Sequence, residues 1–262
     1  MDLQYTADDT VLVTGASRGI GAALVRGLVA EGVEDIHVVG RDRESLRALG
    51  AEIHTTSDVH LHEHVLDLSD AAQRRELSGL VEQVDVLVNN AGAIPAGALE
   101  GADLPRWQAS WDLKVWGYVE LAKFALSQMS RRGHGVIVNM IGASGERHDA
   151  SYLAGSMGNA ALMAFTRTVG AQSLDEGIRV VGVNPGPVET ERLARILRER
   201  AADRWGDPDR WRELTAHYPA GRIATVEEVA DLAIFLASRR ASYISGTIVT
   251  LDGGMSWTGS IL

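Results

Sequence analysis

The chain has 262 residues, of which 45% are hydrophobic and 23% are charged, which is ordinary for a globular protein with a substantial core. Its 25 Lys and Arg residues against 35 Asp and Glu give a formal net charge of −10, which argues against sequence-independent binding to nucleic acid or to an anionic membrane. There is no cysteine, so the sequence holds neither a disulfide framework nor a thiolate nucleophile. Small molecules are therefore the expected partners.

The sequence predicts neither a leader peptide nor a domain boundary. Residues 1–10, MDLQYTADDT, lack a basic region followed by an apolar run, and no stretch is apolar for long enough to span a bilayer. We therefore expect a cytoplasmic protein. Because no linker, low-complexity run or internal repeat interrupts the chain, we expect one domain over residues 1–262.

Short apolar runs alternate with longer amphipathic ones. The runs that predict strands are TVLVTG (10–15), DIHVVG (35–40), HVLDLS (64–69), VDVLVNNAG (84–92), GVIVNMIG (135–142), GIRVVGVNPG (177–186) and SGTIVTLDGG (245–254). Helical spacing is found in GIGAALVRGLVAEG (19–32), WDLKVWGYVELAKFALSQM (111–129) and NAALMAFTRTVGAQSLDE (159–176). This alternation predicts an α/β fold, a doubly wound parallel sheet with helices on both faces, which binds ligands beyond the carboxyl ends of its strands.

A glycine-rich turn follows the first predicted strand. TGASRGIG, residues 14–21, places three glycines between a strand and a helix, where they permit a tight turn and close approach of the backbone to a pyrophosphate. Its spacing, TGxxxGxG, resembles that of the short-chain dehydrogenase/reductase family. Four further segments resemble this family in the same order, namely LDLS (66–69), NNAG (89–92), NPGPVET (184–190) and TVEEVADLAIFLASRRASYISGTIVTLDGG (225–254).

The resemblance implies a Rossmann-fold oxidoreductase that uses a nicotinamide dinucleotide. The residues that it places on the diphosphate are Thr14, Gly15, Ser17, Gly19, Ile20 and Gly21. Near the adenine it places Asp67 and Leu68, near the ribose Asn90, Ala91 and Gly92, and near the nicotinamide Pro185, Gly186, Val188 and Thr190. It also implies a substrate lid at about 190–222, in which Trp205 and Trp211 either enclose an apolar substrate or pack the lid itself.

The charge after the second predicted strand indicates which dinucleotide is bound. NAD is usually held there by an acidic residue on the ribose hydroxyl, whereas NADP needs a cation for its extra phosphate. This chain has Gly40 at the acidic position, followed by Arg41, and Arg18 lies in the glycine-rich turn. Arginine can bind a phosphate through two parallel hydrogen bonds, so the sequence favours NADP. Asp42 leaves NAD as the alternative.

The family's four catalytic positions are all substituted. GNAAL at 158–162 matches the segment that contains the family's lysine, which places Asn159 at the lysine position and Gly155 at the tyrosine position. In this register Gly142 stands at the serine position and Lys114 at the asparagine position.

A shifted register that uses the neighbouring Tyr152 does not restore the set. It requires a serine at 139 and a lysine at 156, where the chain has Asn139 and Ser156. Neither register therefore supplies the family's proton donor, which carbonyl reduction needs for the developing alkoxide.

Nearby polar residues are the candidate replacements. Tyr152 precedes Gly155 by one helical turn, and the glycines at 142 and 155 leave room for it. Lys114 can act as an acid or base if burial lowers its pKa, and Ser144, His148 and Asn159 are further candidates. Each also has an ordinary interpretation, as a packing residue, a solvated helix position or a loop polar group.

Three functions remain open at this point. The first is an oxidoreductase, most simply NADP-dependent, that interconverts a carbonyl and an alcohol on a moderately large apolar molecule with a rebuilt proton donor. The second is a lyase, dehydratase or isomerase on the same scaffold. The third is a catalytically inactive dinucleotide-binding subunit. Fold alone does not distinguish them.

Two remaining features concern metals and assembly. HLHEH, residues 60–64, places three histidines on one face of a strand. The family that this chain resembles has a surface strand without a metal at this place. We therefore expect no metal site. The family's common dimers and tetramers imply a homodimer or homotetramer through the helices containing 113–129 and 159–174. The apolar terminal segment SWTGSIL (256–262) is expected to join that contact.

Overall fold

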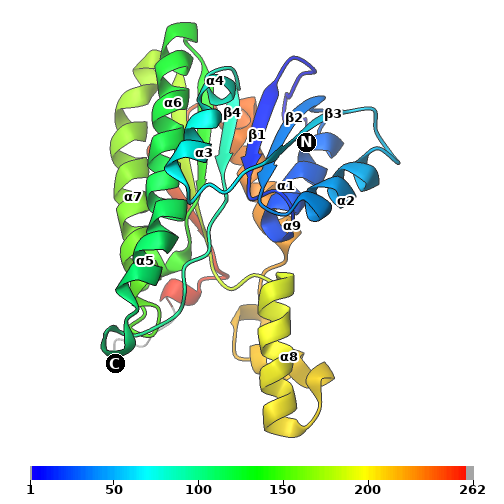
Figure 1. Cartoon of the computed structure of the whole chain (residues 1–262), viewed down its shortest axis with the longest axis vertical. Coiled ribbons are helices and arrows are strands. Elements are labelled where there is room, and N and C mark those ends of the chain that lie inside the picture. The colour runs from blue at the N-terminus through cyan, green and yellow to red at the C-terminus, as the bar shows by residue number, and fades with distance from the viewer. Residues whose placement is uncertain (1, 258–262) are drawn as a thin grey trace.

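The computed structural model describes residues 2–257 and consists of one seven-stranded parallel sheet with helices on both faces (Figure 1). The strand order is β3-β2-β1-β4-β5-β6-β7, so the order reverses between β1 and β4. The strands are β1 (Thr10–Thr14), β2 (Asp35–Gly40), β3 (His60–Val65), β4 (Val86–Asn89), β5 (Gly135–Met140), β6 (Ile178–Pro185) and β7 (Ile248–Leu251). The predicted α/β class is confirmed, and the terminal residues 258–262 of SWTGSIL lie outside the described part.

Two helical layers enclose the sheet. The helices are α1 (Gly19–Ala30), α2 (Arg43–Ile53), α3 (Ala71–Glu76), α4 (Ser78–Val81), α5 (Leu104–Trp111), α6 (Gly117–Arg132), α7 (Leu153–Ser173), α8 (Glu191–Trp205) and α9 (Val226–Ala237). The larger core cluster joins α1, α2 and α9 to one face of the sheet, and a second cluster joins α4 and α6 to the other. Side chains along β1 alternate between the two faces of the sheet, since Val11 and Val13 belong to the first cluster and Leu12 belongs to the second.

Two predicted elements differ from the structure. The third strand is His60–Val65 rather than 64–69, because the register with β2 pairs His60 with Asp35 and ends at Val65. The long helix predicted over 111–129 is interrupted by a π-helical turn, η2 (Asp112–Trp116), between α5 and α6. Such a turn contains one extra residue per hydrogen-bonded ring, and sequence periodicity does not reveal it.

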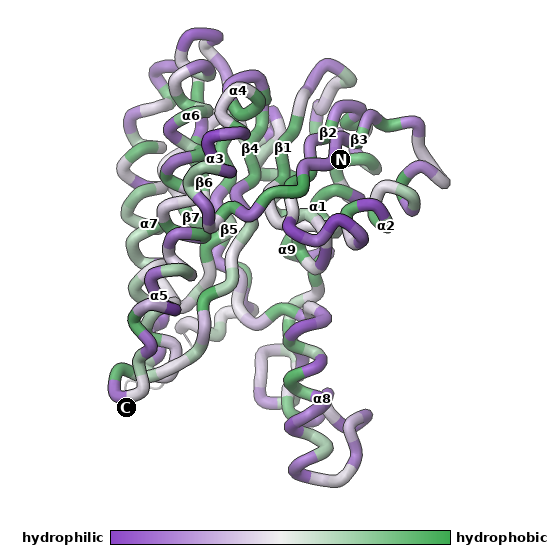
Figure 2. The backbone as a smooth tube through the Cα atoms, viewed as in Figure 1, coloured by the Kyte–Doolittle hydropathy of each residue, from purple (hydrophilic) through white to green (hydrophobic). Residues whose placement is uncertain are grey.

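The segment expected as a lid extends away from the sheet. It contains α8 and the 3-10 helix η5 (Pro208–Thr215), which pack on each other around the buried residues Leu197, Ala201, Trp211 and Ile223 (Figure 1). Its two ends meet in an isolated β-bridge between Val188 and Ala224. Figure 2 shows hydrophilic and hydrophobic residues alternating along α8. The lid therefore has its own small core and a narrow attachment to the body.

Within residues 2–257, none of the helices is both long enough and apolar enough to cross a bilayer.

Candidate active site

One large pocket opens where the carboxyl ends of the central strands meet the lid. It is lined by the segments that follow β1 to β6 and by one side of α8. Its volume of about 2330 Å³ exceeds the ~300–1,000 Å³ of a typical small-molecule site. The pocket therefore has room for a dinucleotide together with a second small molecule, at the edge of the sheet where ligands of such folds bind.

The glycine-rich turn presents the N-terminus of α1 to this pocket. Arg18, at the N-cap position, makes no side-chain capping hydrogen bond, so the amides of the first turn have no cap. Gly15 and Gly19 line the pocket with φ angles of 66° and 56°, which glycine adopts without strain. A Cβ at Gly21 would lie 2.1 Å from the Gly15 carbonyl oxygen. The turn thus requires glycine, and the uncapped amides suit an anion such as a diphosphate.

Thr14 braces this turn from behind. Its Oγ1 accepts hydrogen bonds from the amides of Asn90 (2.9 Å) and Ala91 (3.1 Å), while the Asn90 side chain donates to the carbonyl of Thr14 at 3.0 Å. Thr14 and Gly21 do not line the pocket, whereas Asn90, Ala91 and Gly92 do. Among the residues expected on the diphosphate, Thr14 and Gly21 therefore shape the loop, and Gly15, Ser17, Gly19 and Ile20 face the cavity.

Three arginines gather at the end of the pocket beyond β2. Arg18, Arg41 and Arg43 all line it. Asp42, the residue that left NAD open, accepts hydrogen bonds from the amides of Glu44 (3.1 Å) and Ser45 (3.2 Å) as the N-cap of α2. Its carboxylate is engaged in capping, and with Glu44 it sets two carboxylates against the three guanidinium groups that line this end.

Asp67 affects the arginine-lined end of the pocket only through its contact with Arg41. It does not line the pocket, whereas Leu68 does. Its Oδ2 lies 3.7 Å from Nη1 of Arg41, and its Oδ1 accepts from the Ser69 amide at 2.9 Å. Burial tends to raise the pKa of Asp67, but the hydrogen bonds from Ser69 and the charge of Arg41 outweigh it and lower the pKa. The ionised carboxylate therefore holds Arg41 at the pocket wall.

The two other residues that the Tyr152 register requires do not reach the pocket. Asn139 is fully buried and links Asn89 to Thr166 through hydrogen bonds of 3.0 Å each. Ser156 is also buried, and its hydroxyl accepts from the Asp149 amide at 3.0 Å. Neither Asn139 nor Ser156 lines the pocket, so the register built on Tyr152 has no further functional group there.

Tyr152 occupies the space beside Gly155. It is the residue immediately before α7, and it lines the pocket. A Cβ at position 155 would lie 1.9 Å from Cε1 of the Tyr152 ring, so the ring fills the volume that a side chain at 155 would need. Burial raises the pKa of Tyr152, and the positive charge of Arg192 partly opposes this shift. The phenol is therefore protonated at neutral pH.

Gly142 and Asn159 are similarly interlocked. Gly142 lines the pocket with a φ of 136°, and a Cβ there would lie 2.8 Å from Nδ2 of Asn159. That amide donates to the Ser144 hydroxyl at 2.8 Å, and both side chains line the pocket. The Asn159 Oδ1 accepts no hydrogen bond from any described residue. Ser144 and Asn159 thus form a hydrogen-bonded polar pair in the wall of the pocket that Tyr152 also lines.

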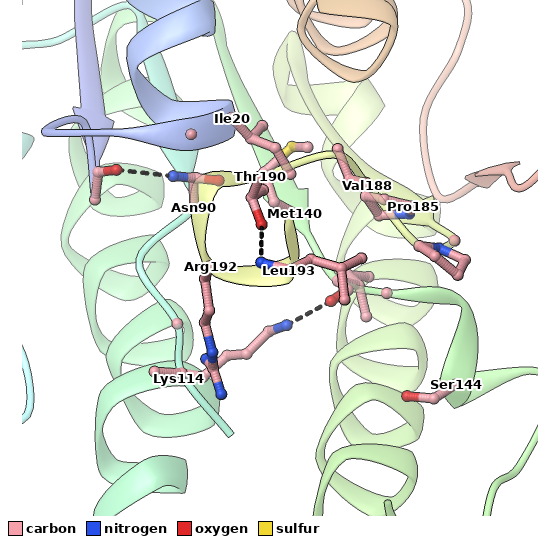
Figure 3. A pocket seen from close by; sticks show the side chains of 18 of the residues that line it. Ile20, Asn90, Lys114, Met140, Ser144, Pro185, Val188, Thr190, Arg192 and Leu193 are labelled. Carbon is pink, nitrogen blue, oxygen red and sulfur yellow. Dashed lines mark hydrogen bonds between the residues drawn. The ribbon is translucent and has the colours of Figure 1, made fainter. Parts of the chain in front are cut away.

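Lys114 enters the same wall from the π-helical turn. Its ammonium donates a hydrogen bond to the Ile141 carbonyl, and Figure 3 shows it directed toward that carbonyl across the pocket wall. A Cβ at Gly92 would lie 2.9 Å from Cδ of Lys114, so the stem of the lysine lies close over Gly92. Burial lowers the pKa of Lys114 from 10.5 to about 8. A lysine with this pKa exchanges protons near neutral pH.

The lid contributes cations that sequence reasoning missed. Arg192, in the first turn of α8, lines the pocket beside Leu193 and Thr190 (Figure 3) and forms no ion pair within the described residues. His217 of the lid also lines the pocket, and so do Arg147 and His148 of the loop between β5 and α7, of which His148 was a candidate from the sequence. The arginine-rich sequence of α8 was visible in the chain, but only the fold shows which of its arginines turn inward.

The two lid tryptophans pack the lid. Trp211 is 2% exposed within the lid core, and Arg198 and Arg212 lie over its ring. Trp205 packs against the same core, with Arg204 and Arg210 over its ring. Neither indole lines the pocket. Of the two interpretations of these residues, the structure supports packing.

The pocket therefore joins an anion-binding end to a proton-exchanging end. At the first end lie the uncapped α1 amides and three arginines, and at the second a phenol and a lysine of lowered pKa. Pro185, Gly186, Val188 and Thr190 line the stretch after β6. This order of groups along one cavity suits a dinucleotide that presents its far end to a substrate oxygen.

Comparisons with known proteins show what this chain is similar to. A family model described as enoyl-(acyl carrier protein) reductase matches residues 15–256. A cis-4-hydroxycyclohexanecarboxylate dehydrogenase of Sinomonas cyclohexanicum is 36% identical over 95% of this chain and 96% of its own, and a 3beta-hydroxysteroid dehydrogenase of Eggerthella lenta is 33% identical over 94% and 93%. A crystal structure of L-sorbose reductase from Gluconobacter frateurii, complexed with NADPH and L-sorbose, is similar with a TM-score of 0.92, 29% identity and coverage of 99% and 100%.

Proposed function

The chain belongs to the short-chain dehydrogenase/reductase family, and we propose that it is an NADP(H)-dependent oxidoreductase that interconverts a carbonyl and an alcohol with a non-standard proton donor. One observation carries the proposal: the Tyr152 phenol lies over Gly155 in the wall of the same pocket that holds the dinucleotide motifs. A site that retains its cofactor residues and also presents a protonated acid has the groups for carbonyl reduction.

NADP(H) fits the chemistry of the residues present. The amides at the start of α1 suit the diphosphate, and Arg18, Arg41 and Arg43 offer cations for the additional phosphate. The L-sorbose reductase to which this chain is similar is complexed with NADPH, which supports the same assignment, with NAD as the alternative. When bound, the dinucleotide supplies or accepts the hydride at the carbon of the substrate carbonyl.

Tyr152 is the proposed acid. In the direction of reduction its hydroxyl donates a proton to the substrate oxygen as the carbon gains hydride, and the product is an alcohol. The raised pKa keeps this proton on the phenol at neutral pH. Ser144 and Asn159 hold the same oxygen through hydrogen bonds, and Lys114, with its pKa of about 8, returns a proton to the site from solvent.

The substrate carries an anionic group on an apolar body in this proposal. Arg192 is a cation without an ion-pair partner among the described residues, and its charge is felt by Tyr152. Arg147 and Arg195 line the pocket as well. The dehydrogenase of Sinomonas cyclohexanicum acts, by its name, on a hydroxycyclohexane that bears a carboxylate, which matches this combination.

The test is a pair of substrates that differ only in charge. With NADP⁺ as oxidant, turnover of cis-4-hydroxycyclohexanecarboxylate is compared with that of its methyl ester by absorbance of NADPH. We expect the acid to have the higher kcat/KM, and Arg192→Ala to reduce that preference about tenfold by removing one charge-assisted contact. Arg204→Ala is the control, because Arg204 lies on the same helix but does not line the pocket.

Two results contradict the proposal at different levels. Equal turnover of acid and ester, unchanged by Arg192→Ala, rejects the anionic substrate but leaves the oxidoreductase in place. Absence of NADPH formation from any alcohol, together with no binding of NADPH or NADH in a calorimetric titration, rejects the oxidoreductase itself.

We further propose a homodimer or homotetramer formed through α6 and α7. Trp116, directly before α6, is 56% exposed, and Met157 on α7 is 48% exposed. Large apolar side chains at this level of exposure are suited to burial between subunits. Sedimentation equilibrium of the wild type and of Trp116→Glu checks it, because a monomeric wild type would contradict it.

A further inference from the structure

Histidines of the edge strand β3 meet two potential metal ligands on β2. The register of the two parallel strands pairs His37 directly with His62, and Asp35 precedes His37 by two residues. Because side chains two residues apart point to the same face of a sheet, Asp35, His37 and His62 share one face. The sequence shows only the histidines of β3, and the sheet supplies the other two ligands from a segment 25 residues earlier.

The three side chains are spaced like metal ligands. One ligand atom from each of Asp35, His37 and His62 lies within 4.8 Å of the other two. Nε2 of His62 is 3.0 Å and Nε2 of His37 is 3.7 Å from Oδ1 of Asp35. Nitrogen and oxygen ligands at ~2.0–2.2 Å from a tetrahedral zinc lie ~3.3–3.6 Å from one another. The observed separations bracket this range.

The carboxylate is oriented but incompletely satisfied. Oδ2 of Asp35 accepts a hydrogen bond from the Thr10 hydroxyl at 3.0 Å. Oδ1 is buried and accepts no hydrogen bond from any described residue, since His62 approaches it without hydrogen-bond alignment. A buried carboxylate oxygen without a donor is unfavourable unless a cation satisfies it.

The rings of His37 and His62 stack with centroids 4.4 Å apart and planes at 16°, so the half-exposed His62 ring must turn before both nitrogens face one ion. Nδ1 of His37 lies 3.0 Å from Nε2 of His64, which leaves Nε2 of His37 directed at Asp35. Ligating histidines commonly use the second ring nitrogen for such a fixing hydrogen bond. His62 is half exposed, so an ion reaches the cluster from solvent.

We propose that Asp35, His37 and His62 form a binding site for a zinc-like divalent transition metal, with water at the fourth position. The ligand set of two imidazoles and a carboxylate is one that zinc accepts. The site lies at the amino-terminal halves of β2 and β3, whereas the pocket lies at the carboxyl ends, so its role is to tie the edge strand β3 to the sheet. The proposal does not depend on the proposed function.

The test uses ZnCl₂ as the probe and the full chain after treatment with a chelator. Isothermal titration calorimetry should show one Zn²⁺ bound per chain, and His62→Ala and Asp35→Asn should each weaken binding at least tenfold. His60→Ala is the matched control, because His60 is an exposed histidine of the same strand outside the cluster. Zn²⁺ should also raise the Tm of the wild type and of the control, but not of His62→Ala.

Either of two outcomes overturns the site. No uptake of Zn²⁺ by the wild type would show that the cluster is a hydrogen-bonded group of neutral histidines. Equal affinity in His62→Ala and His60→Ala would show adventitious surface binding only. Affinity for NADPH, measured on each variant, verifies that the variants are folded, since the pocket is distant from the substitutions.

Discussion

The two ends of the pocket are built in different ways. At the anion-binding end, the glycine-rich turn and the uncapped start of α1 depend on local backbone geometry, and Thr14 ties this turn to Asn90 of the segment after β4. At the proton-exchanging end, the groups come from α7, from the π-helical turn and from the lid, and they fit together only through tertiary packing. In the proposed function, the cofactor end therefore keeps the family pattern, whereas the reacting end relies on packing between distant segments.

The largest expected effect tests whether the rebuilt end performs chemistry. Tyr152→Phe removes the phenolic proton and retains the ring beside Gly155, so we expect kcat to fall by a factor of about 10²–10⁴ with NADPH affinity unchanged. Stopped-flow or steady-state absorbance of NADPH measures kcat, and calorimetry measures the affinity for NADPH. Tyr243→Phe is the control, because Tyr243 is 91% exposed and outside the pocket. Unchanged turnover in Tyr152→Phe would remove this residue from the mechanism.

A second variant tests whether the phenol must lie at its observed position or need only be present in the pocket. Gly155→Ala adds a Cβ where the Tyr152 ring lies, so the ring must move while the hydroxyl remains in the protein. We expect a loss of kcat comparable with that of Tyr152→Phe, again with NADPH affinity retained. Full activity in Gly155→Ala would mean that the ring position is unimportant.

The next effect concerns the buried lysine and appears in stability. The pKa of Lys114 falls from 10.5 to about 8 on folding, which corresponds to at most about 3 kcal/mol in a cavity open to water. Below pH 8 the native state bears this full cost. Between about pH 8 and 10.5 the unfolded chain keeps the proton and the native chain releases it, so this group's contribution to stability rises with pH.

Lys114→Met should therefore stabilise the protein at pH 7, with a Tm several degrees above the wild type, and the advantage should shrink toward pH 10. Thermal unfolding at pH 7 and pH 9.5 measures it. Lys123→Met is the control, because Lys123 is an exposed lysine of the following helix α6. A lower Tm for Lys114→Met at both pH values would indicate that the hydrogen bond to Ile141 outweighs desolvation.

The smallest effect sharpens the description of the anion-binding end. Arg41→Ala should weaken NADPH about tenfold and NADH little, because only NADPH carries the phosphate that a cation binds. Asp42→Ala should lower the Tm slightly through loss of the α2 cap, without changing the ratio of the two affinities. Fluorescence titrations with both dinucleotides measure the ratio. Equal losses for NADPH and NADH in Arg41→Ala would show that this arginine does not recognise the phosphate.

Sequence patterns predicted the two ends unequally, for a physical reason. The parallel sheet and the glycine-rich turn depend on local periodicity and on backbone angles that few residues adopt, so both can be predicted from the sequence. The clash between a Cβ at 155 and the Tyr152 ring, the π-helical turn that holds Lys114 and the inward direction of Arg192 depend on packing between distant segments. Helical spacing predicted that Tyr152 lies near Gly155, but it did not predict the protonation state of the Tyr152 phenol.

The bridge between Val188 and Ala224 has a consequence for the evolution of this protein. The Glu189 amide donates to the Ala224 carbonyl at 2.8 Å, and the Ala224 amide donates to the Pro187 carbonyl at 3.1 Å, so the two chain crossings into the lid are adjacent. The segment between them carries its own buried cluster around Trp211. A segment with neighbouring ends and its own core can be replaced by the corresponding segment of a relative. Replacing 189–223 can therefore change the substrate preference, while the sheet and the dinucleotide contacts before β5 are retained.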